Sequence, residues 1–149
     1  MTPSLFVTSS FDQDVKLWDL RQKPNQPCYS ASGSRGNVIV CFSLDDHYLL
    51  VSAIDNEIKQ LLVVDGRLHL DLAISSIGSS QNYSRSYYMN GRKYVISGSC
   101  DEHVVRICCA HTGRRLKLLQ AQSQFGMAGA AAVAMAAHRE ASDVQLGLT

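Results

Sequence analysis

Three stretches of the chain repeat one pattern, and this repeat limits the possible fold more than any other feature of the sequence. Each copy has a strand-like run, a short turn with an acidic residue, and a second strand-like run. The copies occupy residues 6–21, 48–67 and 94–114. Aligning them places Trp18, Leu61 and Cys108 at one position, with separations of 43 and 47 residues. Periods of this length are typical of folds in which each repeat is one small antiparallel sheet.

The first copy, FVTSSFDQDVKLWDLR, predicts a β-hairpin. Residues 5–10 are small, β-branched or apolar, and residues 11–14 are a polar turn. From Val15 onward, side chains alternate in character as they do along a strand with two different faces. The second and third copies predict hairpins in the same way, with Asp55 and Asp101 in their turns.

Further strands are expected beside the second and third hairpins. Inner strands are predicted at residues 38–43 and 83–89, and outer strands at residues 68–74 and 116–120. The sequence therefore predicts two nearly whole four-stranded sheets. A first sheet precedes them and holds only its later strands.

The chain resembles the WD-repeat β-propellers over roughly residues 4–120. The residues that carry the resemblance are Ser9, Ser10, Asp12, Val15, Lys16, Leu17, Trp18 and Asp19 in the first unit, and Ser97, Gly98, Ser99, Asp101, Thr112 and Gly113 in the third. In the second unit Leu61-Leu62 stands in place of Trp-Asp, and Gly36-Asn37 stands in place of a Gly-His pair. The resemblance implies an all-β fold, an incomplete WD-repeat β-propeller, and an incomplete relay of His, Asp, Ser or Thr, and Trp.

The expected organisation is a partial propeller in residues 1–120 and an alanine-rich tail in residues 121–149. Because alanine is the strongest helix former, we expect a helix followed by disorder in the tail. Propellers close with about four to eight blades, and this chain accounts for fewer. We therefore expect a piece of a longer protein, or a truncated isoform whose bare sheet edges and apolar faces promote self-association.

Residues 6–21 also resemble a narrower box, found in WD-repeat substrate receptors of cullin-4 RING ubiquitin ligases. The box ends in Trp-Asp-x-Arg, and its positions fall here on Asp12, Trp18, Asp19 and Arg21. The resemblance implies docking to the ligase adaptor, the large subunit of the damaged-DNA-binding protein. An arginine just past a strand end can reach a partner's carboxylates with two parallel hydrogen bonds. The simpler alternative is a core Trp18, a turn-forming Asp12 and a solvated Arg21.

Two other protein-binding or nucleic-acid-binding roles stay open. One is a generic WD-repeat scaffold without a link to a ligase. The other is a nucleic-acid-binding module, because basic side chains and tyrosines are interleaved in the third unit. The near balance of 14 Lys and Arg against 13 Asp and Glu gives little support to this second role.

Neither enzyme chemistry nor a bound cofactor is expected. No nucleophile elbow, P-loop or paired-histidine zinc motif occurs in the sequence. Cys100, His103, Cys108, Cys109 and His111 lie close in sequence but lack the spacing of zinc ligands. The sequence has no basic and apolar leader and no convincing membrane span, so we expect a nuclear or cytoplasmic protein with free cysteines.

Overall fold

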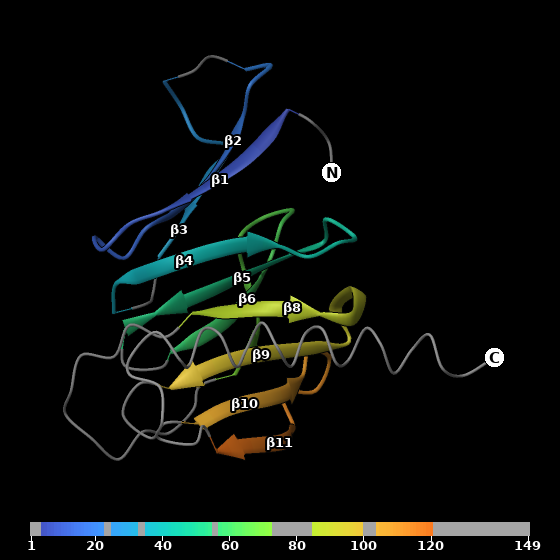
Figure 1. Ribbon diagram of the computed structural model, residues 1–149. Coiled ribbons are helices and arrows are strands. Elements are labelled where there is room, and N and C mark those ends of the chain that lie inside the picture. The colour runs from blue at the N-terminus through green and yellow to red at the C-terminus, as the bar shows by residue number, and fades with distance from the viewer. Residues whose placement is uncertain are drawn as a thin grey trace.

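The computed structural model describes residues 4–22, 25–32, 35–54, 57–72, 85–99 and 104–120. These residues form three antiparallel sheets that lie one against the next, and no α-helix occurs among them (Figure 1). The alanine-rich tail at residues 121–149 lies outside the described residues. No helix in the described part is long and apolar enough to cross a membrane.

The strands follow one another along the chain, and every neighbouring pair is antiparallel. The first sheet, in the order β1-β2-β3, consists of Leu5–Ser9, Val15–Asp19 and Tyr29–Ala31. The second sheet, β4-β5-β6-β7, consists of Asn37–Phe42, Tyr48–Ala53, Ile58–Leu62 and Leu68–Asp71. The third sheet, β8-β9-β10-β11, consists of Ser86–Met89, Tyr94–Ser99, Val104–Cys109 and Arg115–Gln120.

This arrangement confirms the all-β fold class and the order of the predicted strands. The first sheet holds three strands, and the second and third hold four each. Strand β3 was not expected, because the short run Tyr29–Ala31 has no alternation long enough to signal a strand. The turn residues Asp55 and Asp101 lie outside the described residues.

Two apolar cores hold the three sheets together. The core between the first and second sheets contains Val15, Leu49, Val51 and Leu61. The core between the second and third sheets contains Leu50, Ile58, Leu72, Val95, Cys108 and Ala110. Successive side chains of a strand point to opposite faces, so Leu49 and Leu50 of β5 enter different cores. The middle sheet is buried on both faces, which explains the continuous apolar run in β5.

The three units repeat in space as well as in sequence. Register pairs Phe6 with Trp18 in the first sheet, Leu49 with Leu61 in the second, and Val95 with Cys108 in the third. The second of these pairs faces the first sheet, and the third pair faces the second sheet. The first pair points away from the second sheet, since Val15 on the other face of β2 packs against it. Each unit therefore turns the same face toward its predecessor, as successive blades of an incomplete propeller do.

Candidate functional site

Asp12 holds the turn of the first hairpin. Its Oδ1 accepts the backbone N–H of Asp14 at 3.2 Å, and its own N–H donates to Ser10 Oγ at 3.4 Å. These contacts lower the pKa of the Asp12 carboxyl, first through the Asp14 N–H and then through the Ser10 hydroxyl. Asp12 therefore fixes the local turn, the role that its residue type predicts.

Trp18 lies on the outer face of the first sheet. Its indole Nε1 donates to Thr8 Oγ1 at 2.9 Å, and its ring stacks on Phe6 with centroids 5.9 Å apart and planes 7° apart. Phe6 is 40% exposed, although the equivalent Leu49 is fully buried. None of the sheets in the described part of the chain covers this face, so Trp18 does not lie between two of them. The bond between Trp18 and Thr8 is one step of the expected relay.

The start of β4 contacts the turn of the first hairpin. Asn37 stands at the position of the expected histidine and is buried. Its Nδ2 donates to the carbonyl of Asp14 at 3.2 Å, and its backbone N–H donates to the carbonyl of Ser10 at 3.1 Å. The amide thus binds the backbone of the first hairpin's turn, and the contact ties the first sheet to the second.

Asp19 and Arg21 form a two-point ion pair at the end of β2. Arg21 Nε donates to Asp19 Oδ1 at 3.0 Å, and Nη2 donates to Oδ2 at 2.7 Å. The backbone N–H of Arg21 also donates to Oδ1 at 2.9 Å. These bonds, first from the side chain and then from the backbone, lower the pKa of Asp19 to about 2. The Asp19 side chain is only 7% exposed, whereas that of Arg21 is 67% exposed, so the pair presents its cation to solvent.

The four residues of the predicted box are therefore divided between two ends of one hairpin. Trp18, Asp19 and Arg21 are together at the end of β2, whereas Asp12 lies at the opposite end, in the β1–β2 turn. A partner at this end would meet Arg21, with Asp19 behind it. Asp12 acts on that surface only through the shape of the hairpin.

The geometry of Asp19 and Arg21 recurs in the second unit, which our sequence analysis missed. Asp65 Oδ1 accepts the backbone N–H of Arg67 at 3.0 Å, and Arg67 Nε donates to Oδ2 at 2.5 Å. The signal was present in the sequence, because Asp-x-Arg follows the strand at residues 19–21 and again at residues 65–67. It went unnoticed because Leu61-Leu62 replaces the Trp-Asp that marks the first copy.

The third unit carries a weaker form of this turn. Thr112 replaces the aspartate, and its Oγ1 accepts the backbone N–H of Arg114 at 3.3 Å. The three turns at residues 20–22, 63–67 and 110–114 thus each present an arginine that follows a side-chain acceptor by two positions. We call these turns together the arginine rim.

Tyr29 of β3 contacts the second turn of the arginine rim. Its hydroxyl donates to the carbonyl of Leu62 at 3.5 Å, and its ring lies where a Cβ on Gly66 would be 2.6 Å away. Gly66 has a φ of +72°, a left-handed value that glycine adopts without strain. Burial raises the pKa of Tyr29 to about 12. The Arg67 turn is therefore seated directly on the first sheet, on the side where β2 ends.

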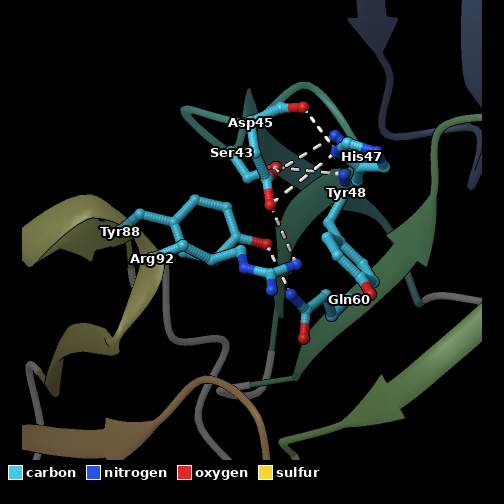
Figure 2. A network of polar contacts seen from close by, with 7 residues as sticks. All are labelled: Ser43, Asp45, His47, Tyr48, Gln60, Tyr88 and Arg92. Atoms are coloured by element: carbon cyan, nitrogen blue, oxygen red, sulfur yellow. Dashed lines mark hydrogen bonds and ion pairs between the residues drawn. The ribbon is translucent and has the colours of Figure 1, made fainter.

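A polar network fixes the same end of the second sheet to the third (Figure 2). Arg92 ends the short 3-10 turn η2 (Asn90–Arg92), and its Nη1 lies 3.2 Å from Asp45 Oδ2. The Arg92 guanidinium also lies over the Tyr48 ring, 4.3 Å from its centroid. Burial acts to raise the pKa of Asp45, but hydrogen bonds from Ser43, His47 and Arg92 outweigh it, so the pKa is lowered. This network therefore joins the β4–β5 turn of the second sheet to the start of β9 in the third.

Three of the basic and aromatic side chains of the third unit are buried or engaged between the sheets. Arg92 is engaged with Asp45 and Tyr48, and Arg106 is buried at the junction with the second sheet. Tyr88 is half-buried, and its hydroxyl accepts Gln60 Nε2 at 2.9 Å. These residues serve the packing of the sheets, so they leave little for base stacking.

The cysteine and histidine residues of the third unit are also dispersed. Cys108 is buried against the second sheet, and Cys109 points to the other face of β10. Cys100 and His103 lie outside the described residues. Within the part of the chain that the structure describes, no group of three metal-binding side chains forms.

Comparisons with known proteins identify one relevant similarity. The chain is 69% identical over 116 residues to Protein DWD HYPERSENSITIVE TO UV-B 1 of Arabidopsis thaliana. The match covers 78% of this chain and 15% of that protein, so the chain spans a small part of its relative's length. No family model matches the chain.

Proposed function

We propose that this chain is part of a WD-repeat substrate receptor of a cullin-4 RING ubiquitin ligase, and that it docks to the ligase adaptor through the arginine rim. The observation that carries the proposal is the exposed Arg21 guanidinium, held by Asp19 in one orientation. The term DWD in the name of the Arabidopsis relative supports it. In this proposal the ubiquitin-transfer chemistry resides in other subunits, so the chain is not an enzyme, and it acts in the nucleus or cytoplasm.

The physical basis is preorganisation. A guanidinium has five N–H donors, and Asp19 engages Nε and one hydrogen of Nη2, which leaves the Nη1 side for a partner. Because Asp19 already holds the side chain, docking costs little additional side-chain entropy. Arginines of this kind are frequent hot spots at protein interfaces.

Arg67 provides a second contact in this proposal. Its side chain is 78% exposed, and Asp65 accepts its Nε and its backbone N–H. Tyr29 seats the Arg67 turn on the first sheet, on the side where β2 ends, and this supports the view that both arginines meet one partner surface. An acidic or carbonyl-rich surface of the adaptor matches them in charge.

The test measures binding of the full 149-residue chain to the purified adaptor. Arg21→Ala is expected to cost about 2 kcal/mol or more, roughly a thirtyfold loss of affinity, because a hot-spot arginine is removed. Arg67→Ala is expected to weaken binding less, and Arg21→Ala with Arg67→Ala together to abolish it. Arg85→Ala is the matched control, since Arg85 is exposed just before β8, at the opposite end of that strand from η2.

Circular dichroism of each variant separates lost docking from lost fold. If Arg21→Ala binds the adaptor like the parent chain, the box has no docking role. If the parent chain does not bind the adaptor but captures other proteins, the generic scaffold is the better description. A partner that nuclease treatment removes would favour the nucleic-acid module.

A further inference from the structure

The third sheet has an apolar outer face that is buried, although no other sheet in the described part of the chain lies against it. Val95 and Cys108 are paired in register and point toward the second sheet. Ile96 and Val105 lie an odd number of positions from them along β9 and β10, so their side chains point to the opposite, outer face. Ile96 is 4% exposed and Val105 is 0% exposed, yet neither belongs to the two apolar cores between the sheets.

Burial this complete requires atoms above the outer face. Neighbouring strands shield a side chain only at its sides, and a sheet face that no layer covers is in contact with water. The outer face of the first sheet illustrates this, because Phe6 is 40% exposed there. Met89 of β8 also belongs to the outer face of the third sheet, opposite Tyr94, and is only 7% exposed. The cover must therefore come from a part of the chain outside the described residues.

The composition of the chain favours one segment as this cover. Residues 73–84, AISSIGSSQNYS, contain five serines, and residues 100–103, CDEH, contain two acids. Residues 121–137, in contrast, contain no charged residue. We call residues 121–137 the uncharged tail. Its larger apolar side chains are Phe125, Met127, Val133 and Met135. Of the three segments, the uncharged tail has the most apolar surface to remove from water.

The place where the tail leaves the third sheet fits this assignment. Register pairs Gln120, the last residue of β11, with Val104, and it pairs Leu119 with Val105. The tail therefore begins one residue pair away from the buried Val105. Four strands are about 15 Å wide, and a helix of the length of the uncharged tail would span about 25 Å. The tail is thus long enough to cross the whole outer face.

We propose that the uncharged tail folds back over the outer face of the third sheet and covers Ile96 and Val105 as an alanine-rich helix. The apolar surfaces of tail and sheet leave water together, which drives the contact. The tail is covalently joined to β11, so its high effective concentration favours it over the tail of a second copy. A tail in this position closes the outer face to other partners. The contact is separate from the arginine rim and does not depend on adaptor docking.

The test uses the full 149-residue chain with carbon-13-labelled methyl groups. Nuclear Overhauser cross-peaks are expected between the methyl groups of Ile96 or Val105 and those of Met127, Val133 or Met135. Val51 is the internal control, because it lies in the core between the first and second sheets and should give no cross-peak to the tail. A mixture of two differently labelled chains separates contacts within one chain from contacts between copies. Cross-peaks between copies are expected to be absent.

Two charge-matched variants test whether the tail makes this contact. Successive residues of a helix point about 100° apart, so four consecutive glutamates place a carboxylate on every side of it. The first variant carries Ala131→Glu, Ala132→Glu, Val133→Glu and Ala134→Glu. The control carries the same charge beyond the uncharged tail, through Val144→Glu, Gln145→Glu, Leu146→Glu and Gly147→Glu. The first variant is expected to lose every cross-peak between tail and sheet, and the control is expected to keep them. Glutamate is a good helix former, so the loss does not reflect a lost helix.

Four results would overturn the proposal. The first is a parent chain without any cross-peak from the tail to Ile96 or Val105. The second is a set of cross-peaks from Ile74 or Ile77 instead, because residues 73–84 would then be the cover. The third is a set of cross-peaks that arises only between copies. The fourth is unchanged cross-peaks in the first variant.

Discussion

At the scale of single residues, the end of β2 combines a nearly buried carboxylate with an exposed cation. Asp19 accepts three hydrogen bonds of good length from Arg21, one of them from its backbone. Asp19 and Arg21 are only two residues apart, so the tight turn after β2 is enough to bring their side chains together. Its consequences for acid stability follow from the pKa of Asp19.

We expect Asp19 to contribute to acid unfolding in a narrow pH range. Its pKa is about 2 in the folded chain, against an ordinary value of 3.8. A lowered folded pKa means that the contribution is complete above about pH 4 and is lost as the pH falls through about 2. Asp19→Asn should therefore flatten the pH dependence of urea unfolding between these values. Arg21→Gln should flatten the same range, and an unchanged slope in both variants would contradict this assignment.

A comparison of Gly66 and Gly91 separates two costs of adding a side chain: the clash with a neighbouring residue and the strain of a left-handed backbone. Both have positive φ, +72° and +69°, but only Gly66 has an atom near the position of an added Cβ, the Tyr29 ring at 2.6 Å. Gly91→Ala is expected to cost about 1 kcal/mol of unfolding free energy, for the left-handed backbone alone. Gly66→Ala is expected to cost about 1–3 kcal/mol more, because the ring must move. Urea unfolding measures both, and equal losses would disprove the contact.

At the scale of elements, the second and third sheets combine an apolar core with a buried polar bond. Gln60 of β6 is fully buried and donates from Nε2 to the hydroxyl of Tyr88 on β8. Ser52 Oγ of β5 accepts the backbone N–H of Ser86 at 3.0 Å. These two bonds tie the inner strand of the third sheet to the middle of the second. Burial raises the pKa of Tyr88, so its hydroxyl stays protonated at neutral pH.

A double-mutant cycle tests whether this bond fixes the position of β8. Tyr88→Phe leaves the buried amide of Gln60 without its acceptor and is expected to cost about 1–3 kcal/mol of unfolding free energy. Gln60→Leu together with Tyr88→Phe removes both partners and is expected to cost less than the sum of the two single changes. Thermal and urea unfolding of the four proteins give the coupling. Additive losses would indicate that the two side chains act independently.

At the scale of the whole molecule, the first sheet differs from the others in what covers it. The equivalent residues Phe6, Leu49 and Val95 are 40%, 0% and 1% exposed. The face of the first sheet that carries Phe6 and Trp18 is thus as apolar as the buried faces of the other sheets. Within the described residues, however, it is exposed to solvent. Apolar faces of this kind promote association.

We expect the chain to self-associate through this face. Phe6→Lys places a charge on it and is expected to shift the sedimentation coefficient toward that of the monomer at a given concentration. Leu44→Lys is the control, because Leu44 is 78% exposed in a turn away from this face. A parent chain that sediments as a monomer at all concentrations would contradict the prediction. So would an equal effect of both substitutions.

Local patterns were sufficient to predict most of the fold. The alternation after Val15 and the turn at Asp12 depend on side chains a few residues apart, and the repeat of this local pattern at Trp18, Leu61 and Cys108 can be read directly from the sequence. Strand β3 escaped prediction, since three residues do not establish a period. For the candidate site, the sequence indicated Asp19 and Arg21 but missed Asp65 and Arg67, whose turn lacks the neighbouring tryptophan.

The sequence by itself therefore determined the hairpins and their order. Backbone periodicity and turn chemistry are local and can be read in one dimension. Only the tertiary structure decided that Tyr29 seats the turn of Arg67, that Arg92 bridges two sheets, and that Phe6 is exposed within the described residues. These features depend on which segments, distant in sequence, pack against each other. The burial of a side chain follows from that packing and cannot be read from the residue alone.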